Sequence, residues 1–501
     1  MMIPRSLTVR DLMALSDVPF GTSGARGLVA DMTDRICFSY TVGFLQYLAQ
    51  VGEFGAGSKV ALAGDLRPSS PRILAACAAG IRAAGGEPVF CGYVPTPAVA
   101  LYAMDRGMAS LMVTGSHIPD DRNGIKFYRA GGEVLKADEA GISGQLLDID
   151  PALFAGDGSL IAPAPLPAPV DAQTDYVRRY VDFFGAGALS GLSVGVYQHS
   201  AVGRDMLLDI LSALGAATMA LGRSERFIPV DTEAVRPEDM ELARGWAAEH
   251  GFDAIASTDG DSDRPLLADH TGTWLRGDVL GVLCAAALGA DCVVTPVSSN
   301  SLLEKSGLFA RTGRTRIGSP YVIAEMTAQL AAGGTVCGYE ANGGFLLASD
   351  FTREGRVLSA LPTRDAILPI VAALAAAQGR RLVDLSANLP ARVTHSDRIK
   401  DFPTANSQAV VAFLLAGDPA AQMARIGHWF GAIAGNPVGL DLTDGLRMEF
   451  ASGAIIHLRP SGNAPELRCY TEADTAQAAE ALNIAALALV RNGLATAALA
   501  G

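Results

Sequence analysis

The chain has 501 residues, of which 50% are hydrophobic and 18% charged. This composition excludes a disordered or fibrous protein and predicts three or four folded domains of ordinary size. The formal net charge of −13 excludes a strong non-specific grip on nucleic acid or on an anionic membrane, because both require a cationic surface. An anionic substrate could still bind where the few cations gather in one cleft.

The first structural pattern is a β-branched strand, a small polar loop, a helix, a glycine and a further strand. It is clearest at 59–91, where a strand over 59–65 precedes a helix that starts at Pro71 and runs to about Ala84. The pattern returns from Leu192 and, more loosely, from Asp291. Such alternation predicts three similar mixed α/β domains with ligands at the strand ends.

In the second and third copies the pattern predicts helices over 206–214 and 302–310. Between the first two copies, residues 149–170 contain five prolines, which favour an extended linker. After about Leu389 the sequence pattern changes. A strand-like stretch at 446–458 contains a turn at Ser452-Gly453, and an Ala-rich helix follows from Thr475. These features predict a smaller α+β C-terminal domain. The expected domains are residues 1–162, 163–271, 272–388 and 389–501.

The seven cysteines indicate a reducing compartment. Their number is odd, no C-x-x-C pair occurs, and most lie in apolar stretches, as buried free thiols do. Arg10 and Asp11 stand where a signal peptide needs an apolar core. Of the two longest apolar stretches singled out, 281–297 contains Asp291, and 366–378 is shorter than a membrane span. We expect a cytoplasmic protein without a membrane or nucleic-acid partner.

The first candidate site is the segment TGSHIPDDRNGIK at 114–126, directly after an apolar run. It presents a small, exposed serine, Ser116, that could exchange a phosphoryl or acyl group. His117 and Lys126 are nearby candidates for carrying the proton. Alternatively, the Ser116 hydroxyl bonds only to its own turn backbone, as serines ahead of a proline often do.

The second candidate site is the acidic segment TDGDSDR at 258–264. Alternate side chains of an extended loop share one side, so Asp259, Asp261 and Asp263 can converge on a hard cation such as Mg²⁺ or Ca²⁺. An EF-hand is excluded because its sixth position would be Arg264 rather than glycine. Arg264 beside metal ligands suits a phosphate site. The alternative is a solvated acidic turn.

Two loops could bind phosphate or sugar. The segment RPSGN at 459–463 offers the guanidinium fork of Arg459, a hydroxyl and accessible backbone N–H groups. The segment GYEANGGF at 338–345 places Glu340 and Asn342 two residues apart, a spacing suited to vicinal sugar hydroxyls. An ordinary turn and a flexible loop are the respective alternatives.

A fifth loop, FGTSGARG at 20–27, could form a small anion nest around Arg26, or be a plain glycine-rich turn. The segment GLSVG at 191–195 matches a nucleophile elbow, but Ser193 begins a strand instead of following one. No dinucleotide-binding, Walker or zinc-protease motif occurs.

Taken together, the five segments resemble the α-D-phosphohexomutase superfamily, specifically its bacterial phosphomannomutase/phosphoglucomutase branch. They occur in that family's order and span nearly the whole chain. The resemblance implies an α/β fold of three similar mixed α/β domains plus a smaller α+β C-terminal domain around a central cleft. It also implies a Mg²⁺-dependent enzyme that interconverts hexose 6-phosphate and hexose 1-phosphate, with mannose the leading substrate. The reaction would pass through a phosphoserine and a bisphosphorylated sugar, with hexose 1,6-bisphosphate as activator.

The resemblance also implies a role for each site residue. The catalytic residues would be Ser116, Lys126, His117 and Arg264; the Mg²⁺ ligands Ser116 (through its phosphate), Asp259, Asp261 and Asp263; and the substrate-binding residues Arg26, Glu340, Asn342, Arg459, Ser461, Gly462 and Asn463.

This chain departs from the family pattern at points that bear on substrate choice. It reads SHIP where the family usually has SHNP, and Asn342 stands where many members have serine. Ser319 stands where relatives often have His, Trp or Tyr, and a lysine common near Val297 is absent. Phosphoglucomutase and phosphoglucosamine mutase therefore stay open, as do a non-catalytic phosphosugar-binding protein and a metal-dependent phosphatase. The oligomeric state is expected to be monomer or homodimer.

Overall fold

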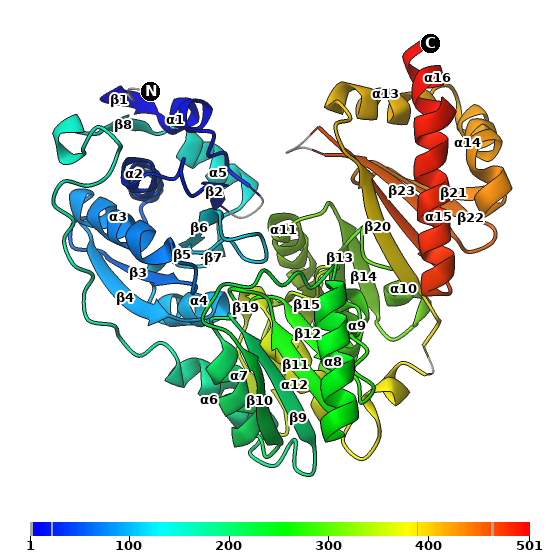
Figure 1. Cartoon of the computed structure of the whole chain (residues 1–501), viewed down its shortest axis with the longest axis horizontal. Coiled ribbons are helices and arrows are strands. Elements are labelled where there is room, and N and C mark those ends of the chain that lie inside the picture. The colour runs from blue at the N-terminus through cyan, green and yellow to red at the C-terminus, as the bar shows by residue number, and fades with distance from the viewer. Residues whose placement is uncertain (1–3, 22–23, 388, 462–464, 501) are drawn as a thin grey trace. The chain divides into compact units, whose positions relative to one another are not determined.

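The structure is a computed structural model that describes residues 4–21, 24–387, 389–461 and 465–500 (Figure 1). The chain divides into two compact units. Unit 1 comprises Met1–Val293 and Gly318–Ala387, and unit 2 comprises Val294–Ile317 and Asn388–Gly501.

The N-terminal part of unit 1 is a mixed α/β sheet with strand order β2-β6-β5-β3-β4. Strand β3 pairs parallel with β4 and β5, whereas β6 pairs antiparallel with β5 and β2. The elements are β1 (Ser6–Thr8), α1 (Val9–Ser16), β2 (Gly24–Leu28), α2 (Asp34–Gln50), β3 (Lys59–Gly64), α3 (Ser70–Ala83), β4 (Glu87–Tyr93), α4 (Thr96–Met104), β5 (Ala109–Val113), β6 (Arg122–Arg129), β7 (Gly132–Glu133), α5 (Lys136–Ser143) and β8 (Leu146–Asp148).

The first copy of the sequence pattern is confirmed here. Strand β3 is an apolar run buried along nearly its whole length, and α3 has Pro71 in its first turn, where a missing N–H costs nothing. Helix α3 packs against α2 at Gly80, where a Cβ would lie 2.9 Å from the Cβ of Thr41. The two helices can therefore approach closely and cover the sheet.

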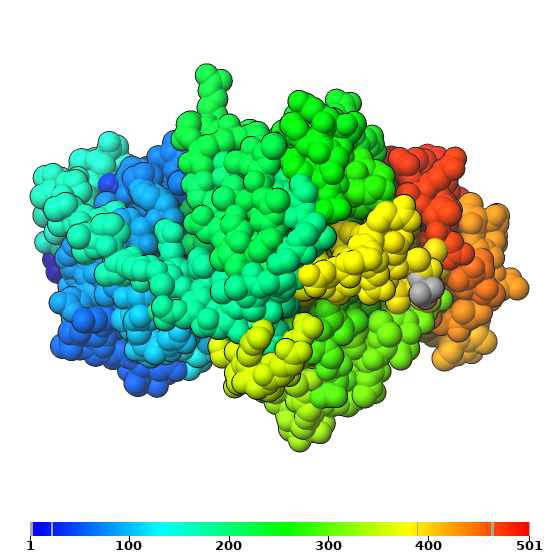
Figure 2. All heavy atoms as spheres, turned by 90° about the horizontal axis from the view of Figure 1, so that it is seen from below, coloured from blue at the N-terminus to red at the C-terminus, as the bar shows by residue number. Residues whose placement is uncertain are grey.

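The second copy forms a sheet with strand order β10-β9-β11-β12, in which only the β11–β12 pair is antiparallel. The predicted helix at 206–214 is α7, which begins two residues earlier. The space-filling view shows the segment around α6 beside the N-terminal part, where α6 contacts α4 (Figure 2). The elements are α6 (Thr174–Phe184), β9 (Ser193–His199), α7 (Arg204–Ala213), β10 (Ala217–Arg223), α8 (Pro237–His250), β11 (Ala254–Thr258) and β12 (Pro265–Ala268).

In the third copy, strands β15, β16 and β19 pair antiparallel within unit 1. The predicted helix over 302–310 is wrong in length, because α10 ends at Lys305 and Gly307 takes a left-handed φ of 65°. The elements are α9 (Gly277–Leu288), β13 (Cys292–Pro296), α10 (Leu302–Lys305), β14 (Arg311–Thr315), α11 (Ser319–Leu330), β15 (Val336–Tyr339), β16 (Phe345–Leu347), β17 (Phe351–Arg353), β18 (Arg356–Leu358), β19 (Leu361–Asp365) and α12 (Ile367–Ala376).

The C-terminal part of unit 2 is an antiparallel sheet with strand order β20-β24-β23-β22-β21 and helices packed on it, the α+β arrangement predicted. The stretch at 446–458 is the hairpin β22–β23, turning at Gly453. The elements are β20 (Val393–Ile399), α13 (Thr404–Leu414), α14 (Pro419–Ala434), β21 (Pro437–Asp441), β22 (Leu446–Phe450), β23 (Ile455–Pro460), β24 (Leu467–Ala473), α15 (Ala476–Leu489) and α16 (Ala495–Ala500).

By length and composition alone, one helix in the described part of the chain could cross a membrane, namely Ala476–Leu499. The bent pair 404–414 and 419–434 would count as a second span if it is taken as one. Leu482, Leu487 and Val490 of the first helix lie in the hydrophobic core of unit 2. These side chains of the helix therefore pack within the folded unit, and 39% of its apolar window is buried.

Candidate active site

The serine loop follows β5, a fully buried strand in the middle of the first sheet, and so lies at the carboxyl end of that strand. Ser116 takes a left-handed φ of 55°, and its backbone N–H donates to Thr114 Oγ1 over 2.8 Å. The serine is 1% exposed, which corrects the expectation of an exposed residue. Its hydroxyl is covered because the acidic loop of the second sheet packs on it.

Arg67 holds the serine loop in shape, and the sequence patterns did not single it out. Its guanidinium donates to four backbone carbonyls of the loop, those of Ser116, Ile118, Pro119 and Arg122, at 2.6–3.0 Å. The side chain is fully buried. A planar fork with five donors suits this task, because each carbonyl lies in a different direction.

The position of Arg67 is itself specified. Its Nε donates to Asp65 Oδ2 over 3.1 Å, and the Asp65 carboxylate also accepts from the hydroxyls of Ser70 and Thr114. Burial nevertheless raises the pKa of Asp65. At Gly115 a Cβ would lie 2.6 Å from Arg67 Cζ, so the loop needs glycine there.

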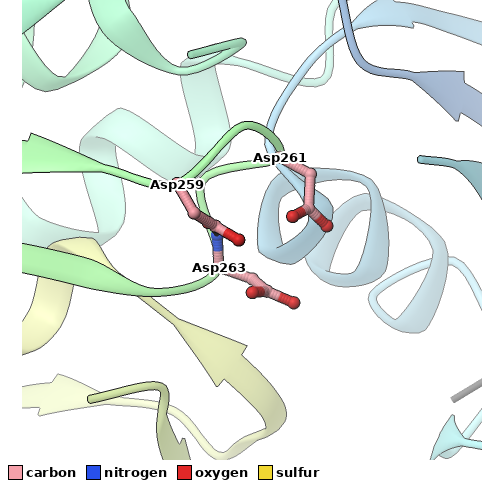
Figure 3. A group of neighbouring side chains, drawn as sticks. All are labelled: Asp259, Asp261 and Asp263. Carbon is pink, nitrogen blue, oxygen red and sulfur yellow. Dashed lines mark hydrogen bonds between the residues drawn. The ribbon is translucent and has the colours of Figure 1, made fainter. Parts of the chain in front are cut away.

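The acidic loop joins the hairpin strands β11 and β12 and brings the three aspartates together. One carboxylate oxygen from each of Asp259, Asp261 and Asp263 lies within 4.8 Å of the others, and all three residues are buried (Figure 3). The loop is shaped by Ser262, whose φ is 57° and whose Oγ accepts from Thr258 and from Gly203 N. The predicted convergence of these carboxylates is confirmed.

The serine and the acidic loop meet directly. Ser116 Oγ donates to Asp259 Oδ2 over 2.6 Å, although the two residues belong to different sheets. Burial raises the pKa of Asp259 well above its ordinary value, and the charges of Asp261 and Asp263 add to the effect. A cation bound here would relieve that repulsion.

Lys126, on β6, supplies one positive charge to the triplet. Its Nζ donates to Asp261 Oδ2 and to Asp263 Oδ2, each over 2.6 Å. Burial works to lower the pKa of Lys126, but the two carboxylates outweigh it and the pKa is raised. The side chain is therefore an ammonium at neutral pH and a proton donor by charge.

The oxygens of the triplet fit a divalent cation. Asp261 Oδ1 and Asp263 Oδ1 are buried and accept no hydrogen bond from any described residue. Such oxygens are costly to bury unless a further partner binds them. A set of three carboxylates is the donor chemistry that Mg²⁺ and Ca²⁺ prefer.

His117 and Arg264 lie beside the serine. Arg264 Nη1 donates to His117 Nδ1 over 2.9 Å, and Ser116 Oγ lies 3.4 Å from the same nitrogen. Burial and the neighbouring Arg264 charge lower the pKa of His117 to about 3. His117 is therefore neutral at physiological pH.

Arg26, on β2, is opposite Gly124 of β6 in the first sheet. Burial, with the charge of Arg264 second, lowers the pKa of Arg26 to about 10, so it stays a cation at neutral pH. The two guanidiniums thus add positive charge near the serine and acidic loops, as the binding of a phosphate requires.

The sugar loop of the resemblance is a tight turn after β15. Gly343 N donates to Glu340 O over 2.8 Å, and Glu340 N donates to Gly344 O over 3.0 Å. The side-chain oxygen of Asn342, Oδ1, accepts a hydrogen bond from Gly344 N and so shapes the loop. The backbone carbonyl of Asn342 accepts a hydrogen bond from the Thr232 hydroxyl. The turn is thus closed by its own hydrogen bonds, with Glu340 and Asn342 both buried.

Two more side chains, which the sequence patterns did not indicate, bond to the acidic loop. Thr96, at the start of α4, donates its hydroxyl to Asp261 Oδ2 and its N–H to Asp261 O. Arg364, on β19, donates to Asp263 Oδ2 over 3.0 Å. Thr96 comes three residues after the end of β4, and Arg364 is the last but one residue of β19. A polar residue near the carboxyl end of a strand was therefore the available signal for both.

The phosphate loop of the resemblance belongs to unit 2. Arg459, on β23, donates its Nε to Asp444 Oδ2 over 2.8 Å, and the same oxygen accepts from Ile317 N. Ser461 is buried and its N–H donates to Glu466 O. Gly462 and Asn463 lie outside the described residues.

The structure thus combines α/β sheets with a serine hydroxyl that faces a carboxylate triplet ringed by lysine and arginine. That combination is typical of proteins that handle phosphate. Four family models match the chain, each named phosphoglucomutase/phosphomannomutase: alpha/beta/alpha domains I, II and III at 17–152, 174–272 and 276–393, and the C-terminal domain at 404–487. The chain belongs to the phosphoglucomutase/phosphomannomutase family.

Individual relatives agree with the family. A phosphomannomutase of Sinorhizobium fredii is 46% identical over 481 residues, covering 95% of this chain and 99% of the relative. A phosphomannomutase of Salmonella muenchen is 43% identical and covers 95% of each chain. A solved phosphoglucomutase/phosphomannomutase family protein of Burkholderia thailandensis has the same fold, with a TM-score of 0.69 at 20% identity, over 95% of this chain and 98% of that one.

Proposed function

We propose that this protein is a Mg²⁺-dependent phosphosugar mutase that interconverts mannose 6-phosphate and mannose 1-phosphate. The observation that carries the proposal is the 2.6 Å hydrogen bond from Ser116 Oγ to Asp259 Oδ2, inside a buried carboxylate triplet. The choice of mannose is supported by the two phosphomannomutase relatives at 46% and 43% identity.

The metal would be held by Asp259, Asp261 and Asp263 together with a phosphate on Ser116. Bound there, Mg²⁺ would neutralise the charge of the phosphoryl group in transfer. The buried Oδ1 atoms of Asp261 and Asp263, which accept no hydrogen bond within the described chain, support this assignment.

In the proposed reaction a sugar hydroxyl attacks the phosphorus of phosphorylated Ser116. The new O–P bond forms as the bond between phosphorus and Ser116 Oγ breaks, the hydroxyl loses a proton and Oγ gains one. Lys126, an ammonium, suits the donor role, and neutral His117, with Nδ1 3.4 Å from Oγ, is the further proton carrier. Arg264 and Arg26 would hold the phosphoryl oxygens.

The bisphosphorylated sugar would then turn over and return its other phosphate to Ser116. We assign Glu340 and Asn342 to the sugar hydroxyls, and Arg459, Ser461, Gly462 and Asn463 to the phosphate that does not react. Hexose 1,6-bisphosphate would act as the activator that restores the phosphoserine. A cytoplasmic location is supported by the seven cysteines, which are all free and buried.

A coupled assay with Mg²⁺ and a hexose bisphosphate tests the activity. Ser116→Ala should lower kcat/KM for mannose 6-phosphate roughly 10³-fold or more, because the group that accepts and donates the phosphoryl is gone. Peptide mapping should find phosphate on Ser116 in the wild type. Ser212→Ala is the matched control and should leave kcat/KM unchanged. Ser212 is an exposed residue near the end of α7, and its hydroxyl bonds that of Thr218. Full turnover by Ser116→Ala would refute the serine assignment.

Comparing kcat/KM for mannose, glucose and glucosamine 6-phosphates decides among the mutases. Mannose 6-phosphate should have the highest kcat/KM. A higher kcat/KM for glucose 6-phosphate or glucosamine 6-phosphate would make that sugar phosphate the assigned substrate instead. Stoichiometric binding without turnover would identify a binding protein, and net release of inorganic phosphate a phosphatase.

A further inference from the structure

Arg364 lies between the acidic loop and the sugar loop. It is 3% exposed and comes from β19, the strand that pairs with β16 directly after the sugar loop. Its Nε donates to Asp263 Oδ2 over 3.0 Å, and its Nη1 donates to Glu340 Oε2 over 3.1 Å. One guanidinium thus bonds to a carboxylate of each loop.

The place of Arg364 is built into its surroundings. Gly344 leaves room for its aliphatic chain, since a Cβ there would lie 2.7 Å from Arg364 Cδ and 2.8 Å from Cγ. Its Nη1 also donates to Ser319 Oγ, which in turn donates to Glu133 Oε2 over 2.7 Å. The guanidinium therefore has little freedom to choose other partners.

The contact sets how Glu340 is presented. Oε2 is bonded to Arg364, whereas Oε1 accepts no hydrogen bond within the described ranges of the chain. A carboxylate fixed through one oxygen offers the other in a defined direction, which is what recognition of a sugar hydroxyl needs. Without Arg364 the buried Glu340 charge would lose its ion-pair partner.

We propose that Arg364 is a positioning residue that orients Glu340 toward the sugar hydroxyls and couples that orientation to the acidic loop through Asp263. The proposal rests on the function proposed above. It requires that loss of the guanidinium has opposite effects on two ligands. The sugar should bind less well, because Glu340 loses its orientation. Mg²⁺ should bind more tightly, because a cation beside Asp263 is gone.

The experiment measures both ligands on full-length Arg364→Gln. KM for mannose 6-phosphate, at saturating Mg²⁺ and bisphosphate, should rise about tenfold, the effect of a lost hydrogen bond between charged groups. The Kd for Mg²⁺, titrated calorimetrically without sugar, should fall. A rise in KM of less than about threefold, or weaker Mg²⁺ binding, overturns the proposal, because weakening of both ligands is the mark of a merely structural role.

Three companion variants sharpen the result. Arg364→Lys keeps the charge but lacks the planar fork whose separate nitrogens bond Asp263 and Glu340, so its KM should lie between those of the wild type and Arg364→Gln. Adding Arg364→Gln to Glu340→Gln should raise KM no further, and additive losses would count against the coupling. Arg353→Gln, an exposed residue of β17, is the matched control and should change neither constant.

The two proposals can fail separately. If the wild type does not turn over mannose 6-phosphate, the substrate assignment fails. The Arg364 proposal is then judged by the same KM and Kd comparison with whichever hexose 6-phosphate the wild type converts. Turnover of mannose 6-phosphate by the wild type, with unchanged KM in Arg364→Gln, leaves the function standing and overturns only the positioning role.

Discussion

Arg67 shows how a single residue can define an active-site loop without facing the substrate. All its five N–H donors have acceptors: Nε bonds Asp65, and the two terminal nitrogens bond the four loop carbonyls. The ring of Phe227 lies 4.0 Å from its guanidinium carbon and closes the site from the other side. The left-handed backbone of Ser116 is held by this set of contacts.

Arg67→Lys should therefore lower both stability and catalysis. Lysine has three donors in place of five, so at least two buried hydrogen bonds from a charged group are lost. We expect the free energy of unfolding to fall by about 3 kcal/mol, and kcat to fall roughly 10²-fold as Ser116 shifts. Urea unfolding and the coupled assay measure the two effects.

The matched control is Arg82→Lys, on the neighbouring helix α3. Arg82 is exposed, and its Nη2 donates to Pro165 O over 3.2 Å at the surface. The unfolding free energy of this variant should change by less than about 0.5 kcal/mol. A kcat of Arg67→Lys equal to that of Arg82→Lys would contradict the assigned role.

At the scale of elements, the sequence predicted the helices, strands and turns that residues within one short window determine. The strand at 59–64 and the helix α3 follow from apolar residues and a proline within one window, and the hairpin at Gly453 follows from its turn. The predicted helix at 302–310 failed because a glycine late in that window ends it.

The site was likewise predictable only where its residues lie close together in the sequence. The aspartate triplet could be inferred because its three members are alternate residues of one loop. Arg67 and Arg364 could not, because their partners lie far along the chain: Ser116 is 49 positions from Arg67, and Asp263 is 101 from Arg364. Only the assembled sheets bring such residues together.

Gly344→Ala tests how closely two elements, the sugar loop and β19, are fitted to each other. The added Cβ would lie 2.7 Å from Arg364 Cδ, the middle of the side chain, so the guanidinium must shift although its charge is kept. We expect KM for the sugar phosphate to rise about tenfold, as for a lost charged hydrogen bond. Overpacking should also lower the unfolding free energy by about 1 kcal/mol.

Gly245→Ala, in α8, is the control for the same substitution in open space. No atom lies within 4 Å of its Cβ position, and alanine favours the helix. This variant should keep the wild-type KM and gain about 1 kcal/mol of stability. Equal KM values for the two alanine variants would show that Arg364 tolerates displacement.

Across the whole molecule, an excess of acidic residues is combined with local cations. The net charge is −13, yet Lys126, Arg264, Arg26 and Arg364 all belong to the serine, acidic and sugar loop region of unit 1. The pKa values of Lys126, Arg264 and Arg364 are raised although burial opposes this, because neighbouring carboxylates outweigh it. The positive charge that a phosphate requires is thus concentrated locally, in a chain whose net charge is negative.

Each unit also contains a buried histidine of the same design. His199 in unit 1 donates its Nε2–H to Thr258 O over 2.8 Å, and His457 in unit 2 donates to Asp444 O over 2.6 Å. In both, Nδ1 is buried and has no hydrogen-bond partner among the described residues. Burial lowers the pKa of each to about 4, because a proton on Nδ1 would have no acceptor.

Both units should therefore lose stability in acid. The folded pKa of about 4 lies below the unfolded value of about 6.5, so the unfolded chain binds the proton first as the pH falls. The contribution of each histidine is complete above pH 6.5 and declines by about 1.4 kcal/mol per pH unit between 6.5 and 4. Urea unfolding at pH 7.5 and at 4.5 should show this loss in the wild type. His457→Gln should flatten the slope for unit 2, whereas His250→Gln, at an exposed position of α8, should keep the wild-type slope. Equal acid slopes for His457→Gln and the wild type would mean that other groups account for the acid sensitivity of that unit.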